Sequence, residues 1–146
     1  MIEIDAAVTT RITTDNTLKG YLGATAGDTR LYSWHPVRDI VYTSSTPAAI
    51  IYGNNMGGRS HLWSFPDQIP NAIYFFRVLS IGKLKLENIS ERLIALFDKT
   101  SITTTHFSVK WIVIAGCTDG ANEGSVTNPI FVKNVSFSFS NFFRRT

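Results

Sequence analysis

Residues 131–140, FVKNVSFSFS, alternate apolar and small polar side chains more regularly than the rest of the chain. Successive side chains of a strand point to opposite faces of a sheet, so this segment predicts a long strand with one packed and one hydrated face. The packed face would carry Phe131, Val135, Phe137 and Phe139, and the hydrated face Asn134, Ser136, Ser138 and Ser140.

Residues 107–115, FSVKWIVIA, predict a second long strand. One face would carry Phe107, Val109, Trp111, Val113 and Ala115, and Ile112 and Ile114 would bury the other. The periodicity favours the protein core over an interface for the strand faces around residues 107–111 and 131–139. Residues 117–129, CTDGANEGSVTNP, predict a connecting loop that is longer than a tight hairpin.

Two helices are expected elsewhere in the chain. Residues 84–100 place apolar side chains at helical spacing, at Leu86, Ile89, Leu93, Leu96 and Phe97. Near the start, Ile4, Val8 and Ile12 recur every four positions, and Leu18 and Leu22 continue this face after a polar break at Asp15 and Asn16.

Three further segments predict strands: a short one at residues 30–34, an apolar one at 48–52 and a central one at 71–81. The expected fold is one α+β domain, residues 1–146, in which two helices cover a mainly antiparallel sheet. A chain of 146 residues has little room for a second core.

Composition points to contact with partners. Only 17% of residues are charged, and the chain has 10 Phe, 5 Tyr and 3 Trp. Interfaces are depleted in charge and enriched in aromatic residues, so part of this surface is expected to be covered. The start has no signal-peptide pattern and no segment approaches the ~20 apolar residues of a membrane span, so we expect a protein of the cytoplasm that has no contact with membranes.

Signatures of catalysis are absent from the sequence. His35, His61 and His106 lie far apart with no metal-ligand spacing, and no nucleophile-elbow, phosphate-loop or dinucleotide motif occurs. We therefore expect no catalytic residue, cofactor or metal. His35 with Arg38 and Asp39 suggests an acid/base cluster, although a loop that satisfies its own backbone explains these residues better. The single cysteine, Cys117, is expected to be a small buried apolar residue.

The order of elements resembles a known family. IDAAVTTRITTDNTLKGYLG (residues 4–23) leads to RLYSW (30–34), PAAIIYG (47–53) and ENISERLIALFDKT (87–100), and two long strands close the chain. This order resembles the tail terminator, or tail completion, proteins of long-tailed bacteriophages. The resemblance implies a virion protein at the head-proximal end of the tail, assembled in the host cytoplasm. It implies a hexameric ring without catalytic residues, which caps the tail tube, stops its polymerisation and meets the neck while DNA passes through the lumen.

Two loops are predicted to carry axial contacts in such a ring, because both are long, rich in glycine and poorly suited to a core. One is an excursion at about residues 53–70, of which residues 57–70 are an insertion relative to the family pattern. The other is the loop of residues 119–128. Their candidate interface residues are Met56, Arg59, His61, Trp63, Phe65, Asp119, Asn122 and Glu123. Arg144 and Arg145 form either a solvated tail or a basic arm toward phosphate or an acidic neighbour.

Other functions stay open at this point. The same particle has neck and head-tail joining proteins, which the sequence does not separate from a terminator. A small α+β enzyme or ligand-binding domain would need a pocket that encloses His35, Asp39 and His106. A nucleic-acid-binding module would need the 14 Lys and Arg residues on one face, whereas they are spread along a chain of formal net charge +3.

Overall fold

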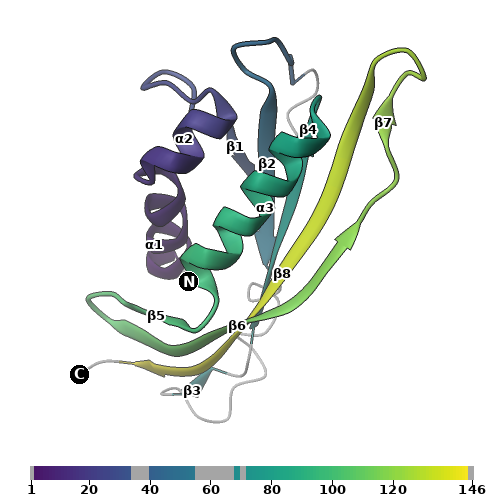
Figure 1. Cartoon of the computed structure of the whole chain (residues 1–146). Coiled ribbons are helices and arrows are strands. Elements are labelled where there is room, and N and C mark those ends of the chain that lie inside the picture. The colour runs from purple at the N-terminus through teal and green to yellow at the C-terminus, as the bar shows by residue number, and fades with distance from the viewer. Residues whose placement is uncertain (1, 34–39, 55–67, 70–71, 145–146) are drawn as a thin grey trace.

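A computed structural model of the chain describes residues 2–33, 40–54, 68–69 and 72–144. In this part of the chain, three helices lie on one face of a curled sheet (Figure 1). The helices are α1 (Ile2–Thr13), α2 (Asn16–Leu22) and α3 (Lys83–Phe97). The strands are β1 (Leu31–Ser33), β2 (Ala48–Asn54), β3 (Gln68–Ile69), β4 (Ala72–Ser80), β5 (Thr100–Thr103), β6 (Phe107–Asp119), β7 (Glu123–Gly124) and β8 (Pro129–Arg144).

The sheet runs in the order β1-β2-β4-β8-β6-β5, and β3 and β7 also pair with β8. Only the β1–β2 pair is parallel among the described strands, so the sheet is mixed. The α+β class is confirmed. The prediction of two helices is wrong. The described chain has three, because the N-terminal segment forms both α1 and α2.

The break between α1 and α2 lies at Asp15. Its backbone is extended, and its carboxylate accepts a hydrogen bond from the Leu18 backbone N–H at 2.9 Å, which caps α2. The same carboxylate receives Nε of Arg92 on α3 at 3.0 Å and a second guanidinium nitrogen at 2.6 Å. The Asp15 side chain therefore caps α2 and links it to α3. The predicted apolar face continues across the break, because its five residues are all buried: Ile4, Val8, Ile12, Leu18 and Leu22.

The core lies between the helices and the sheet. Tyr74 and Phe76 of β4, Phe97 of α3, and Phe137 and Phe139 of β8 pack as aromatic rings with centroids 4.4 to 6.4 Å apart. These five side chains are fully buried. The alternation of β8 thus predicted the packed face of the sheet correctly.

The faces of β6 differ from the prediction. Val109 and Ile112 are both buried, whereas Trp111 is 55% exposed and Val113 is 40% exposed. The cause is a β-bulge, because Ser101 of β5 lies opposite two residues of β6: Thr100 pairs with Ile112, and Ile102 pairs with Val109. A bulge inserts one residue and reverses the alternation beyond it, so Trp111 and Val113 lie on the face away from the helices.

Cys117 is also exposed, which contradicts its expected place in the core. It lies in the upper half of β6, beyond the end of β5. In the described chain, residues 113–119 therefore have a strand neighbour on one side only, which is β8.

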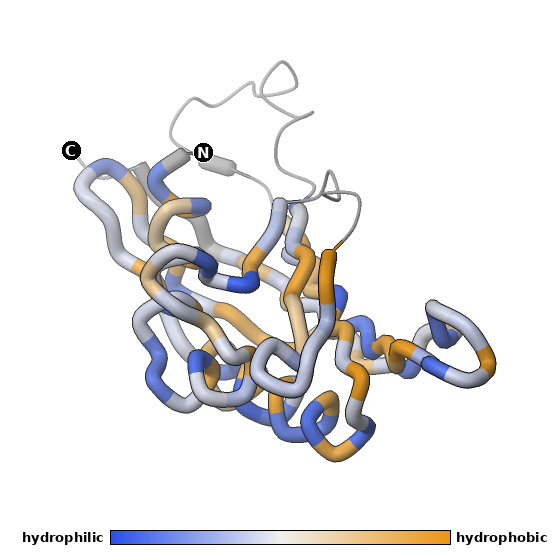
Figure 2. Tube along the Cα trace, turned by 90° about the horizontal axis from the view of Figure 1, so that it is seen from above, coloured by the Kyte–Doolittle hydropathy of each residue, from blue (hydrophilic) through white to orange (hydrophobic). Residues whose placement is uncertain are grey.

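The two terminal strands are longer than predicted, and they shorten the loop between them. Beyond β6, residues 120–129 form a projecting arm that contains β7 and a turn, and this arm stands away from the rest of the chain in both Figure 1 and Figure 2. Gly124 has φ +78°, and a Cβ there would lie 2.5 Å from the Asn128 carbonyl oxygen, so only glycine fits this turn.

We expect Asp15→Ala to lower the free energy of unfolding by about 1–3 kcal/mol, because it removes a helix cap and leaves Arg92 without its carboxylate. Asp15→Asn keeps a capping oxygen and loses only the ion pair, so its effect should be smaller. Urea denaturation of the two variants measures the difference. Equal stability of Asp15→Ala and the wild type would contradict the assignment.

Candidate functional site: two exposed apolar surfaces

Apart from Ile114 of β6, the exposed large apolar side chains of the described chain lie in two regions. One is the sheet face opposite the helices, and the other is the end of the molecule that carries the arm. Most surface apolar residues of soluble proteins are scattered singly, so grouped ones mark candidate contact sites.

The open-face surface consists of Ile73 and Phe75 of β4 and Trp111 and Val113 of β6. The strand β8 runs between them, with Ser138 opposite both Ile73 and Val113, Ser136 opposite Phe75 and Ser140 opposite Trp111. Because the serines of β8 are small, the apolar side chains of β4 and β6 form two separate rows on this face. A hollow of about 300 Å³ lies at one end, where Phe75, Arg77, Gly116, Thr118, Asn134 and Ser136 line it.

The open-face surface carries no formal charge, and its rim is nearly neutral. Arg77 of β4 forms an ion pair with Glu123 of β7. Both side chains are more than a third exposed, so the pair adds only about 0–1 kcal/mol to stability. Its effect is to hold the base of the arm against the open face.

The arm-end surface consists of Val41, Ile81, Leu84 and Val126, together with Lys83 and Lys85. Val41 is 65% exposed, Leu84 75% and Val126 fully exposed. These residues come from the segment before β2, the start of α3 and the arm, which lie at the same end of the molecule (Figure 1). A groove of about 480 Å³ joins two of these segments, with Tyr42, Ile81, Thr127, Asn128, Pro129 and Ile130 as its lining.

Internal contacts fix the shape of the arm-end surface. Arg30 is buried, and its guanidinium donates to the carbonyl oxygens of Ala48 at 3.0 Å and Val41 at 2.9 Å, which holds the segment before β2. On the other side, Lys133 of β8 contacts both carboxylate oxygens of Glu87 on α3 at 2.7 and 2.6 Å, and these hydrogen bonds raise the pKa of Lys133. The base of the arm is thereby tied to α3.

The turn of the arm is held by its own polar groups. The Asn128 backbone N–H donates to the Ser125 hydroxyl at 3.0 Å, and the hydroxyls of Ser125 and Thr127 lie 3.1 Å apart. Val126 lies between Ser125 and Thr127 in this hydrogen-bonded turn, and its side chain is fully exposed.

The candidate interface residues of the sequence fall in different environments. Asp119 ends β6 and lies 3.6 Å from Lys133, Glu123 belongs to β7 and pairs with Arg77, and Asn122 is exposed on the arm. The prediction that Asp119 and Glu123 lie in a loop is therefore wrong, because the strands extend into it. Their carboxylates hold the arm in place.

Other predicted residues are only partly described. Met56, Arg59, His61, Trp63, Phe65 and Arg145 lie outside the described residues, as do His35 and Asp39. The backbone of Arg144 ends β8 and pairs with Phe107, so this residue belongs to the sheet and not to a loose tail.

His106 belongs to a small polar cluster at the N-terminal end of α1. Glu3 accepts hydrogen bonds from the His106 ring, from the Thr104 hydroxyl at 2.7 Å and from the His106 backbone N–H at 3.0 Å. These bonds hold the pKa of Glu3 at about 2, below its usual 4.5, and the His106 ring is the largest cause. The cluster joins α1 to the turn between β5 and β6, and it is exposed.

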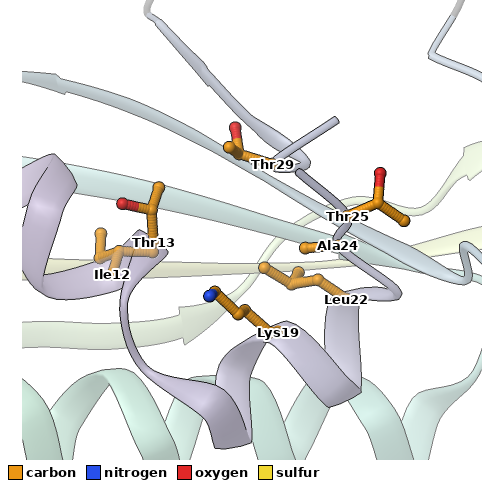
Figure 3. Close-up of a pocket in the computed structure, with 7 residues that line it drawn as sticks. All are labelled: Ile12, Thr13, Lys19, Leu22, Ala24, Thr25 and Thr29. Carbon is orange, nitrogen blue, oxygen red and sulfur yellow. The ribbon is translucent and has the colours of Figure 1, made fainter. Parts of the chain in front are cut away.

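The hollow among the helices is too small for a ligand. Ile12, Thr13, Lys19, Leu22, Ala24, Thr25 and Thr29 line a space of about 20 Å³ (Figure 3). This volume fits one water molecule. Within the described residues, no three side chains of metal-ligating type come together, and no helix is long and apolar enough to cross a membrane.

Comparison with known proteins adds information on the fold only. No family model and no curated protein matches the sequence. One solved structure, whose name describes no activity, covers 96% of this chain and 95% of its own, with a TM-score of 0.55 at 10% identity. At this identity the likeness shows a shared α+β architecture over the whole chain and nothing about activity.

We expect Glu3→Gln to destabilise the protein at neutral pH and to have no effect in strong acid. Folding lowers the pKa of Glu3, so the carboxylate stabilises the fold above pH 4.5, and this contribution is lost as the pH falls toward about 2. Thermal unfolding of both proteins at several pH values measures the trend. A constant gap between the two curves down to pH 2 would contradict it.

Proposed function

We propose that this protein is a structural assembly subunit, and specifically a tail terminator of a long-tailed bacteriophage. The observation that carries the proposal is the presence of two separate apolar surfaces of different character on one small domain. A ring subunit inside a stack needs two kinds of contact, one with its neighbours in the ring and one with the layers above or below. The specific assignment to a phage tail rests on the order of sequence elements.

The open-face surface suits contact between copies of this chain. Interfaces within homo-oligomers are more apolar than transient ones, and this surface combines aromatic and branched side chains with small serines. Association of one patch with a different patch on the next copy closes into a ring when the rotation allows it. The expected product is a closed ring of defined copy number, hexameric as the sequence resemblance implies, with a lumen for DNA.

In the proposed assembly, the ring caps the tail tube, stops further polymerisation and offers its other side to the neck. The site of action is the head-proximal end of the tail in the virion, after assembly in the host cytoplasm. No cofactor takes part, because the function is geometric.

The proposal is tested with purified protein and with tails made without it. Light scattering measures the mass of the particle in solution, and electron microscopy shows whether rings form and whether they sit on tube ends and limit tube length. A protein that stays monomeric at all concentrations and leaves tube growth unchanged would exclude the proposed function.

Trp111→Ser should weaken ring formation without unfolding the subunit. The exposed half of the indole offers roughly 100 Å² of apolar surface, so each contact would lose about 2–3 kcal/mol, or on the order of a hundredfold in affinity. Trp111→Phe keeps most of this apolar surface and serves as the matched control. Normal rings from Trp111→Ser would place the subunit contact elsewhere.

A further inference from the structure

We propose that the arm-end surface docks onto an acidic protein surface with an apolar centre, namely the end of the tail tube. This inference rests on the proposed function, because a terminator must bind the tube before it can stop its growth. It assigns that contact to Val41, Ile81, Leu84, Val126, Lys83 and Lys85.

The charge of the surface favours an acidic partner. Lys83 and Lys85 flank Leu84 in the first turn of α3, and within the described chain neither lysine forms an ion pair. The nearby carboxylates are Glu87 and Asp119, which both contact Lys133, and Glu123, which contacts Arg77. Lys83, Lys85 and Lys133 together outnumber Glu87 and Asp119 by one charge, so this end is net positive, and a second copy presenting the same lysines would be repelled.

The apolar component favours a protein over nucleic acid. Leu84 is 75% exposed and lies between two cations, and Val126 is fully exposed at the end of the arm. A phosphate backbone offers charge but nothing that covers a leucine or a valine, whereas a protein surface offers both. Electrostatic attraction would speed the encounter, and burial of the apolar residues would slow dissociation.

The surface is also arranged before any partner binds. Arg30 holds the segment that carries Val41, Lys133 ties the arm to α3, and hydroxyl and amide groups of the turn fix the residues on each side of Val126. Binding to a preformed surface requires less ordering, so a few exposed residues can suffice for a specific contact.

The test compares Lys83→Glu combined with Lys85→Glu, Leu84→Ser, and a control that makes half of the charge change at another place, Lys19→Glu. Lys19 lies on α2 beside the small hollow of Figure 3, outside the arm-end surface. Acidic residues in the first turn favour the helix dipole, whereas a glutamate at position 83 repels Glu87 one turn further on, so the melting temperature of the double variant is measured beside that of the wild type. The test of binding uses the double variant at a temperature where both proteins are folded. A loss of binding in that variant is then not a loss of folding.

The probes are tails made without this protein and a duplex DNA. We expect the double variant and Leu84→Ser to form normal rings and to bind tails at least tenfold more weakly, while Lys19→Glu binds within twofold of the wild type. Binding of wild-type rings to tails should weaken as salt is raised, whereas ring formation should not.

Three results would overturn the inference. Unchanged tail binding by both the double variant and Leu84→Ser would exclude the surface, and failure of these variants to form rings would make it a contact between copies. If the double variant lost binding to duplex DNA but still bound tails, the surface would be a nucleic-acid site. A wild-type protein that forms no rings and ignores tails would instead remove the proposed function, so the two failures are distinguishable.

Discussion

The packing of aromatic rings between β4, β8 and α3 is the interaction on which the rest of the structure depends. Phe137 and Phe139 project from β8 toward Tyr74 and Phe76 of β4, and Phe97 closes the cluster from the end of α3. Burial of such large side chains supplies most of the driving force for folding in a domain of this size. Because β8 also pairs with β3, β6 and β7, the cluster fixes one strand that positions the open face and the arm.

Elements with a regular period were predictable from the sequence. The Phe and Ser alternation of β8 and the helical spacing of α3 each reflect a single partner surface, so the pattern is preserved in the fold. The N-terminal helix shows the limit of this approach. Its apolar face was identified correctly, but the break at Asp15 depends on a capping bond and on Arg92, which lies 77 residues away in the sequence.

The candidate site was less predictable, for two physical reasons. A bulge opposite Ser101 reverses the faces of β6, and nothing in the sequence FSVKWIVIA indicates it, so Trp111 was assigned to the core. Leu84 lies two positions before Leu86 and therefore off the buried face of α3, which the sequence indicates. What the sequence does not indicate is that this exposed leucine lies at the same end of the molecule as Val41 and Val126, because these residues come together only in the fold.

The part of β6 beyond β5 has a consequence for the solubility of the isolated protein. On the outer edge of β5, the guanidinium of Arg11 donates to the Ser101 carbonyl oxygen at 2.7 Å. Just beyond β5, the Ile114 backbone N–H of β6 donates to the Asp98 carboxylate at 2.9 Å. Beyond that point the strand reads AGCT, without proline or a cation to deter another chain. Residues 115–118 therefore leave backbone groups open to an extended segment of another chain, and this short edge is the part of the described sheet most exposed to unwanted strand pairing.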